Sequence, residues 1–569
     1  MRFLSKIRER QFAKKCGGAY NLSRAVLAGV LAAGCLMPGF AEAAVLDLQK
    51  ESEHGYTFNV AGTTGEKTTT ITSVTGNAGD TISIYWGSNN AGASVEGYTI
   101  NVDPVTIEPK INIYGGKGLN AANGNSVKIS GGIFKNIYGG FATSGTAEGN
   151  SVIINGGEFN ANVCGGFAAN AANGNSFIIN AGTFNSLICG GDGFTAAANG
   201  NIVEIRGGTI NAGVSGGFSE YGTANGNIVS ISGGNFNGNH DVRGGYSRSG
   251  TNSTANNNKV SISGGTVSGG TIYGGKSDYG TANSNSVSIS DVTSNSYFDE
   301  VYGGRGATKA EGNSVSISGG TFNSLICGGD GYTAEGNSVE INGGTINAEV
   351  SGGFSQYGKA NNNKVSISGG EFYYNVHGGY ASSGTAEGNS VEINGGTIKK
   401  NVFGGYSNSG NANKNSVSIS GGTLNGDVRV WGGWAESNSG NANGNSVIIS
   451  GGTFNGNVRV WGGLSQSGTA NKNRVIISGG KFYNRVYGGE GEKAADENRV
   501  IISGGKFSRC WVYGGYSLNG TANRNQVIIS DGTFDGNVVG GSSTKEAKDN
   551  KIVLLGNNAN YTFTNAHVR

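Results

Sequence analysis

The sequence predicts an all-β protein folded as a parallel β-helix, or β-solenoid, of about 17 coils with a cap at each end. A segment close to Asn-x-Val-x-Ile-x-Gly-Gly recurs seventeen times from Asn125 to Asn550. These copies begin every 26.6 residues on average, because 425 residues and sixteen steps separate the first from the last. The chain holds 107 Gly but only 3 Pro, all before the first copy, so no Pro interrupts strand pairing within the array. Such a period of strand and turn residues describes one coil that covers its neighbour's apolar face.

The first part of each coil is predicted to be a strand with one buried face. Alternation puts Val127 and Ile129 on one face and Ser126, Lys128 and Ser130 on the other. The Val and Ile sites stay apolar in later copies, whereas the Lys128 site becomes acidic, small or apolar. Val and Ile are therefore expected to line the core.

The rest of the coil holds a turn, a second apolar anchor and another short strand. Gly131-Gly132 permits a tight turn, Phe134 follows as the anchor, and residues 137–140 form the strand before a polar loop. An alanine lies three places before the repeated asparagine in all seventeen copies, beginning with Ala122, which indicates a cramped corner.

The repeated asparagines are expected to stack and to share amide hydrogen bonds along the axis, as polar ladders do in stacked sheets. We name them the asparagine ladder. Its members are Asn125, Asn150, Asn175, Asn201, Asn227, Asn258, Asn285, Asn313, Asn337, Asn363, Asn389, Asn415, Asn445, Asn473, Asn498, Asn525 and Asn550. Their expected role is structural.

The segments that flank the array are expected to cover its open strand edges. Residues 45–110 leave the repeat register but keep strand-like runs at 56–60, 68–72 and 81–86, which predicts an N-terminal β cap. The array then occupies residues 111–550. Residues 551–569 form a C-terminal cap or tail, in which 552–564 would close the last coil.

Residues 1–44 are predicted to be a secretory signal segment. Seven basic residues accompany an apolar run from Ala25 to Met37, and the sequence Ala41-Glu42-Ala43 suits cleavage near Ala43. The alternatives are a transmembrane anchor, for which the run is short, and a lipoprotein signal ending at Cys35. Removing seven basic and two acidic side chains lowers the formal charge from +2 to about −3, so net charge predicts no nucleic-acid binding.

Cysteines are few in the exported chain, so disulfides cannot be its main source of stability. Cys164 and Cys189 occupy the same site in consecutive coils. In-register stacking would hold their Cα atoms within the span that a disulfide needs, and we predict a bond between them.

The residue before the second Gly-Gly of each coil is expected to point outward, because it follows an inward Val or Ile. We name this set the first row. It reads Tyr138, Cys164, Cys189, Ser215, Arg243, Tyr273, Tyr302, Cys327, Ser351, His377, Phe403, Trp431, Trp461, Tyr487, Tyr513 and Val539. A second row, three places later, reads Phe141, Phe167, Phe218, Tyr246, Phe354, Tyr380, Tyr406, Trp434 and Tyr516.

The two rows predict an exposed aromatic stripe, because flat rings suit contact with sugar faces or with a protein. The candidate binding residues are Tyr138, Tyr273, Tyr302, His377, Phe403, Trp431, Trp461, Tyr487 and Tyr513. The alternative is that the rings stack on one another and only stabilise the coils.

The sequence gives little sign of catalysis, a metal or a cofactor. Residues 270–277 match a phosphate loop, but their glycines belong to the repeat and no helix follows. Residues 190–193 lack the nine-residue aspartate period of a calcium-binding β-roll. Glu204, Glu340 and Glu392 are scattered, the four His are far apart, and no nucleophile motif occurs. We therefore expect no enzyme activity, no cofactor and no metal.

The Asn-x-Val-x-Ile-x-Gly-Gly repeats, the signal segment and the array without proline together resemble passenger regions of bacterial autotransporter adhesins. The resemblance covers residues 110–555 and implies a right-handed parallel β-helix outside a Gram-negative cell. It implies a surface adhesin or structural protein that contacts glycans or proteins of a host or neighbouring cell.

One feature departs from that family. Such passengers precede a membrane β-barrel, whereas this sequence stops at Arg569. Membrane association would then depend on export or on an anchor not visible here. The alternative function is that of a carbohydrate-active β-helix enzyme, which would need a local acidic cluster.

Overall fold

The computed structural model describes residues 45–50, 57–61, 68–75, 81–87, 94–103, 110–195, 197–250, 252–437, 440–556, 560–564 and 568. The predicted signal segment 1–44 lies outside them. All the described residues belong to one compact unit, Ala43–Arg569. Within this part of the chain there are strands and turns but no helix, and hence no helix that could cross a membrane.

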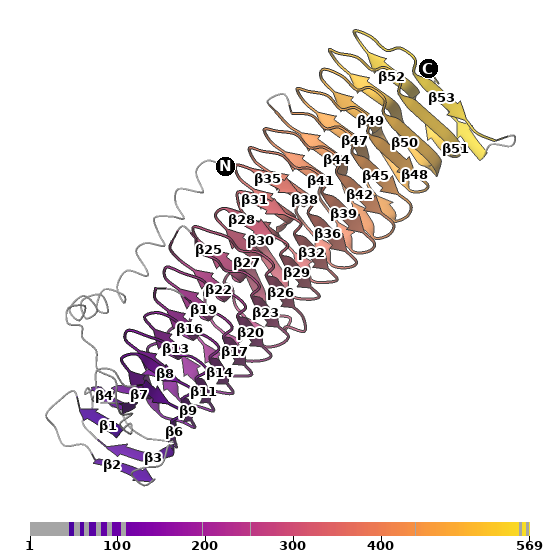
Figure 1. The fold of residues 1–569 in the computed structure, drawn as a ribbon. Helices are drawn as coiled ribbons and strands as arrows, with labels where there is room; N and C mark the ends of the chain where they lie inside the picture. The colour runs from indigo at the N-terminus through magenta and orange to yellow at the C-terminus, as the bar shows by residue number, and fades with distance from the viewer. Residues whose placement is uncertain are drawn as a thin grey trace. The chain divides into compact units, whose positions relative to one another are not determined.

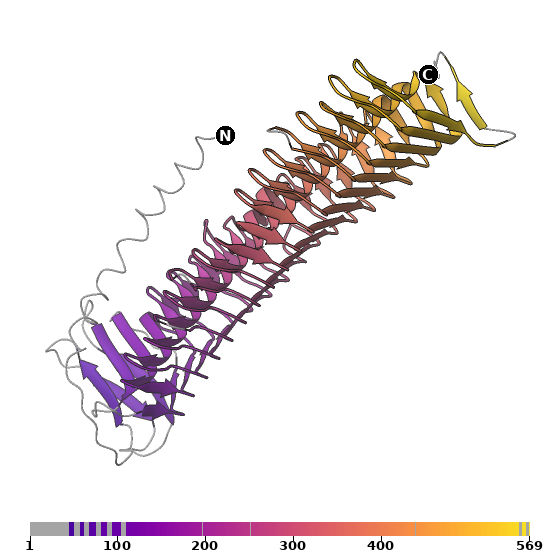
Figure 2. The same ribbon diagram turned by 45° about the horizontal axis from the view of Figure 1, so that its top comes forward.

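The unit is a parallel β-solenoid of about 18 turns, which confirms the predicted fold class. Each coil contributes strand segments to three columns, and a segment pairs in parallel with its equivalent in the next coil. Figures 1 and 2 show these strands stacked coil upon coil.

The first column holds the Val-x-Ile strands. They are β6 (Thr99–Val102), β9 (Ser126–Ile129), β11 (Ser151–Ile154), β14 (Ser176–Ile179), β17 (Ile202–Ile205), β20 (Ile228–Ile231), β23 (Lys259–Ile262), β26 (Ser286–Ile289), β29 (Ser314–Ile317), β32 (Ser338–Ile341), β36 (Lys364–Ile367), β39 (Ser390–Ile393), β42 (Ser416–Ile419), β45 (Ser446–Ile449), β48 (Arg474–Ile477) and β53 (Lys551–Leu554). Two long strands, β50 (Arg499–Ser517) and β51 (Gln526–Asp535), begin in this column and continue into the next.

The second column is short and carries the Phe anchors. It contains β12 (Glu158–Phe159), β15 (Thr183–Phe184), β18 (Thr209–Ile210), β21 (Asn235–Phe236), β24 (Thr266–Val267), β33 (Thr345–Ile346), β37 (Glu371–Phe372), β40 (Thr397–Ile398), β43 (Thr423–Asn425), β46 (Thr453–Asn455) and β54 (Asn560–Phe563). In other coils it merges with the third column, in β10 (Ile133–Ala142), β27 (Tyr297–Gly306), β30 (Thr321–Asp330), β49 (Lys481–Gly491) and the long strand β50.

The third column carries the second Gly-Gly and both aromatic rows. Its remaining strands are β7 (Lys110–Gly118), β13 (Val163–Ala168), β16 (Ile188–Gly193), β19 (Val214–Ser219), β22 (Val242–Ser247), β25 (Ile272–Ser277), β34 (Glu349–Ser355), β38 (Val376–Ala381), β41 (Val402–Ser407), β44 (Arg429–Ala435), β47 (Arg459–Ser465) and β52 (Val538–Ser543). Short loop strands pair separately, β5 (Ser94–Glu96) with β8 (Ala121–Asn123), and β28 (Lys309–Glu311) with β31 (Thr333–Glu335) and β35 (Lys359–Asn361).

The N-terminal segment differs from the array in its strand directions. Antiparallel pairs join β1 (Val45–Lys50) to β4 (Thr81–Gly87) and β2 (Thr57–Ala61) to β3 (Thr68–Thr75). The strand-like runs predicted at 68–72 and 81–86 are therefore strands, and so is the described part of the run at 56–60. Parallel pairing begins before residue 111, because β3 pairs with β6 and β4 with β7. At the other end, β53 and β54 continue the parallel pairing from β51.

The core follows the predicted alternation. Val127 and Ile129 are fully buried, whereas Lys128 between them is exposed. Phe134 and Phe159 stack with ring centroids 5.4 Å apart, as in-register anchors should. These residues belong to one continuous apolar cluster that runs through the whole stack. Each coil is thus stabilised mainly by burial against its two neighbours.

The asparagine ladder forms as predicted, and each side-chain oxygen serves two donors. Asn175 Oδ1 accepts hydrogen bonds from the backbone N and from Nδ2 of Asn150, both at 3.0 Å. Asn201 Oδ1 accepts the equivalent pair from Asn175, at 2.9 and 3.0 Å. Both donors are buried, so the ladder supplies a hydrogen-bond acceptor to groups that water cannot reach.

The ladder also explains why glycine pairs recur in the third column. A Cβ on Gly140 would lie 2.5 Å from Nδ2 of Asn150, and one on Gly139 would lie 2.3 Å from the carbonyl oxygen of Gly165. Both sites therefore exclude any side chain. The predicted cramped corner lies beside them, since Ala122 is fully buried and its carbonyl oxygen would be 2.2 Å from the same Gly140 Cβ.

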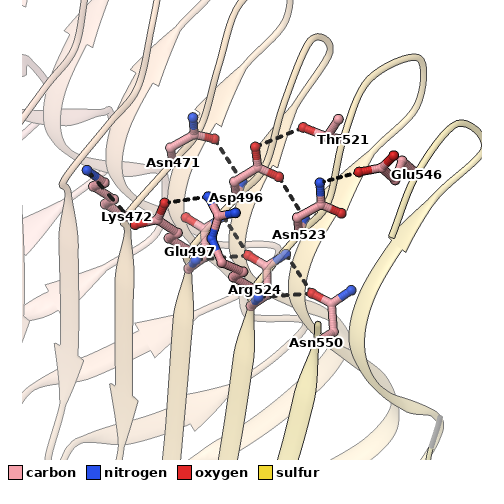
Figure 3. Close-up of polar contacts among 11 residues, drawn as sticks. Asn471, Lys472, Asp496, Glu497, Thr521, Asn523, Arg524, Glu546 and Asn550 are labelled. Carbon is pink, nitrogen blue, oxygen red and sulfur yellow. Dashed lines mark hydrogen bonds and ion pairs between the residues drawn. The ribbon is translucent and has the colours of Figure 1, made fainter. Parts of the chain in front are cut away.

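A second polar ladder, which the sequence analysis missed, is formed by the residues two positions before the asparagine ladder. Its hydrogen bonds point in the opposite direction along the stack. We name it the outer ladder. In Figure 3, Asn471 Oδ1 accepts from the backbone N of Asp496 at 2.8 Å, and Asp496 Oδ1 accepts from that of Asn523 at 2.6 Å. Here the oxygen belongs to the earlier coil, whereas in the asparagine ladder it belongs to the later one. Its other acceptors are Asn123, Asn173, Asn199, Asn225, Asn256, Asn283, Asn361, Asn413, Asn443 and Asn523.

Candidate functional site

The rings of the first row are buried, so the expectation that they face water is wrong. The nine candidate residues are exposed by 9% at Tyr138, 4% at Tyr273, 4% at Tyr302, 4% at His377, 3% at Phe403, 1% at Trp431, 7% at Trp461, 2% at Tyr487 and 8% at Tyr513. All of them except His377 nevertheless lie in apolar clusters separate from the main core. Strand alternation placed them on the correct face, but other side chains cover that face.

Two kinds of contact bury the first row. Along the axis its rings stack, with centroids 4.6 Å apart for His377 and Phe403, 4.6 Å for Phe403 and Trp431, and 5.2 Å for Trp431 and Trp461. Across the strand, the second row lies on top of it, as Trp434 does on Trp431 at 4.8 Å. These contacts favour the alternative that the first row stabilises the coils.

The second row is the part of the stripe that solvent reaches. Eight of its nine members are half-buried, and the exception is Phe218, exposed by 7%. Any partner of the stripe must therefore touch the second row first.

His377 is a neutral member of the first row. Burial lowers the pKa of its imidazole to about 3, and its Nδ1 has no hydrogen-bond partner. The ring packs between Phe403 and Tyr380, with centroids 4.6 and 5.3 Å away. In this position it behaves as one more aromatic ring and not as a proton donor.

Cys164 and Cys189 pair in register as predicted, but the disulfide does not form. Both side chains are buried free thiols. Cys189 Sγ donates to the carbonyl oxygen of Gly191 at 2.9 Å, which turns it toward its own backbone. Hydrogen bonding between the two thiols, together with burial, holds the pKa of Cys164 well above its usual value. A buried neutral thiol is a poor nucleophile.

The middle of the stripe is charged. Arg243 is tolerated in the first row because it contacts Asp241 and lies 4.8 Å from the ring centroid of Tyr246. Arg305 Nε similarly lies 3.2 Å from Asp330, and the guanidinium is 5.3 Å from the Tyr302 ring. Cations in this segment are thus neutralised locally by carboxylates and rings.

Asp192 is a buried carboxyl in the second-row position. Its strand neighbours are Phe167 and Phe218, and burial, with Glu220 nearby, raises its pKa to about 7. No group of three His, Cys, Asp or Glu in the described ranges is placed to hold a metal ion.

A groove of about 660 Å³ opens over the C-terminal part of the stripe. Its walls include Arg429, Trp434, Arg459, Leu464 and Arg485. A smaller groove of about 230 Å³ adjoins it and shares Arg485 and Tyr516. The sequence analysis missed these arginines. They lie two residues before the first-row residue in three consecutive coils, so aligning that position across the coils would have shown them.

Exposed tyrosines on the loops were also missed. Tyr221, Tyr279, Tyr332 and Tyr357 follow the third column in their coils and are exposed by 48%, 62%, 57% and 64%. The signal that could have found them is the recurring Tyr-Gly pair in three of these loops. These rings offer a partner more area than the first row does.

Comparison of the chain with family models, with curated proteins and with solved structures finds no match.

Proposed function

We propose that this chain is an exported, non-enzymatic surface protein of the autotransporter-adhesin type, which contacts glycans or proteins through aromatic side chains. The repeated coils provide the scaffold. The contacting groups are the second row and the loop tyrosines, and the first row supports them from below.

The observation that carries this proposal is the exposure of Tyr221, Tyr279, Tyr332 and Tyr357 at similar places in four coils. Large exposed rings cost free energy in water and gain it when a sugar face or an apolar protein surface covers them. Because the coils stack in register, these rings recur along one surface and suit an extended ligand. The many small polar residues around them supply hydrogen-bonding groups.

A glycan array with the purified chain, paired with a reducing-sugar assay on every bound glycan, tests the proposal. We expect binding without turnover. A variant in which the four loop tyrosines are serine should bind more weakly but keep the unfolding midpoint of the wild type. Absence of binding to glycans and to intact cells would contradict the proposal, and so would turnover.

Export is tested separately by cell fractionation. The proposal expects the mature chain at the cell surface or in the medium, with an N-terminus near Ala44. Recovery of the uncleaved chain in the cytoplasm would contradict it.

A carbohydrate-active enzyme is the second candidate, and Asp192 is the observation that favours it. A carboxyl with a pKa of about 7 is protonated often enough near neutral pH to act as a general acid. Turnover in the reducing-sugar assay that disappears in Asp192→Asn would support this candidate.

A further inference from the structure

Three arginines stack in consecutive coils along one wall of the larger groove. Arg429 pairs in register with Arg459, and Arg485 follows in the next coil, one residue before Val486, the partner of Val460. Neighbouring strands lie ~4.8 Å apart, so the backbone positions that carry these arginines are separated by about this distance. We name these three residues the arginine column.

The column has few counter-charges. Arg459 lies 3.3 Å from Asp427, a carboxylate that is 52% exposed. Among the described residues, neither Arg429 nor Arg485 has a carboxylate within ion-pair distance. Like charges stacked on a sheet repel one another. An anion in the groove would relieve that repulsion, which makes the site complementary to a ligand with several negative groups.

Buried hydrogen-bond donors that lack an acceptor also belong to residues of the larger groove. Five buried side-chain nitrogens in the described residues have no hydrogen-bond partner, and three of these belong to groove residues: Nε1 of Trp431, Nε1 of Trp434 and Nε of Arg459. A buried donor without a partner costs about 1–3 kcal/mol. These donor hydrogens lie buried beneath the groove lining with no acceptor to offset their partial positive charge, which adds to the preference of the groove for a negative ligand.

In the coil after Trp431, the equivalent tryptophan nitrogen has an acceptor. Trp461 Nε1 donates to Glu490 Oε2 at 2.6 Å, and Glu490 occupies the second row of the following coil. For Trp431 that position holds Leu464, which cannot accept. The protein thus supplies an acceptor to one tryptophan of the stack and leaves the preceding one without.

We propose that the arginine column and the adjoining rings bind a segment of acidic polysaccharide, with its carboxylate or sulfate groups on the guanidiniums and its sugar faces on Trp434 and Tyr516. This inference rests on the proposed glycan-binding function and specifies the class of glycan. Arginine is suited to such groups because its planar fork matches a carboxylate or sulfate. Half-buried rings beside it provide the apolar surface that sugar faces need.

The groove lining favours an acidic saccharide over the two nearest alternatives. A neutral saccharide would leave Arg429 and Arg485 without an ion-pair partner, with only the Glu490 carboxylate acting on Arg485 from within the groove. A nucleic acid would bring a continuous phosphate chain against Glu490 and Glu492, which also line the groove. Sugar hydroxyls can instead donate to those carboxylates.

The test measures binding of the full chain to polygalacturonate, with neutral dextran and an oligothymidylate as comparison probes. The variant is Arg429→Gln with Arg485→Gln. The matched control is Arg474→Gln with Arg499→Gln, because these two exposed arginines also stack in register but lie on the first column, away from the groove. Both variants remove two positive charges from the C-terminal part of the array.

We expect polygalacturonate to bind the wild type and the control alike, and to bind the groove variant at least tenfold more weakly, since each lost charge-assisted hydrogen bond is worth about a factor of ten. Trp434→Leu should also weaken it. Equal weakening by both arginine pairs, equal affinity for oligothymidylate, or no binding at all would overturn the inference. If neutral glycans bind on the array while polygalacturonate does not, the inference fails and the proposed function stands. If nothing binds, both fail.

Discussion

Asp192 and Asp330 end two copies of the same ten-residue segment, yet their carboxyls meet opposite neighbours. Both segments read Thr-Phe-Asn-Ser-Leu-Ile-Cys-Gly-Gly-Asp. Burial raises the pKa of Asp330, but Arg305, 3.2 Å away, opposes that rise and favours the ionised form. The charged group near Asp192 is another carboxyl, Glu220, which opposes ionisation. The neighbouring coils therefore decide the chemistry of an identical sequence.

Asp192→Asn should stabilise the protein at alkaline pH. The folded-state pKa of about 7 lies above the unfolded value of 3.8, so the wild type loses stability as pH rises through this interval. The gain in the variant should reach about 2–4 kcal/mol at pH 8 and vanish near pH 4. Denaturant unfolding at pH 4, 6 and 8 measures it. Asp330→Asn is the matched control, and it should stabilise less at pH 8 than Asp192→Asn does, because burial raises the pKa of Asp330 but its ion pair with Arg305 opposes that rise. Equal stabilisation by both variants would contradict the assigned neighbours.

His377→Phe should stabilise the protein in mild acid. The imidazole has a folded-state pKa of about 3, below the unfolded value of 6.5, so the wild type loses stability as pH falls below 6.5. Phenylalanine cannot charge, and it already occupies the same site in the next coil at Phe403. The unfolding midpoint of the variant should exceed that of the wild type at pH 4.5, by more than it does at pH 7.5. A constant difference at both values would show that the histidine titrates normally.

Asn363→Ala should be strongly destabilising. It removes the acceptor of two buried donors, the backbone N and Nδ2 of Asn337, both at 3.0 Å. Leaving these donors without a partner should cost about 2–4 kcal/mol. The measurement is the free energy of unfolding, with hydrogen exchange of the Asn337 amide as a local readout. Asn323→Ala is the control, because Asn323 is exposed and lies outside the ladder. Losses of equal size at the two positions would rule out the ladder as the cause.

Gly329→Ala should destabilise by about 1–3 kcal/mol or more, because its Cβ would lie 2.4 Å from Oδ1 of Asn337. Gly319 lies in the same coil, and a Cβ added there would have no neighbouring atom within 4 Å, so Gly319→Ala should be nearly neutral. Thermal unfolding of the two variants compares them directly. A neutral Gly329→Ala would mean that the ladder shifts easily to make room.

All four cysteines of the described residues should stay unreactive until the protein unfolds. Cys164, Cys189, Cys327 and Cys510 are buried free thiols. Alkylation without reductant should modify none of them in the folded state and all four in guanidinium chloride, as read by mass. A mass that corresponds to a Cys164–Cys189 disulfide would contradict the structure.

Sequence reasoning predicted the fold because each level of the pattern agrees with the next. The Val127 and Ile129 alternation, the anchor at Phe134 and the stacked amides of Asn150 all follow from the requirement that identical coils cover one another. These features depend on the spacing of residues within a coil. The sequence displays that spacing directly.

The candidate site was harder to predict because it depends on what covers a residue. Alternation placed Trp431 away from the core but could not show that Trp434 and Trp461 bury it. The pairing of Cys164 with Cys189 was predictable, whereas the rotation of Cys189 toward Gly191 was not. The arginine column emerges only when three coils are laid side by side, since the linear sequence separates Arg429 from Arg459 by thirty residues.

The opposite directions of the two amide ladders affect the electrostatics of the whole stack. In an α-helix, aligned peptide units add to a macrodipole with partial charges at both ends. Here the side-chain dipoles of the asparagine ladder and of the outer ladder oppose each other. A coil that carries an asparagine in both ladders therefore adds little net side-chain moment, so an array of such coils can grow or shrink by whole repeats without accumulating a side-chain macrodipole.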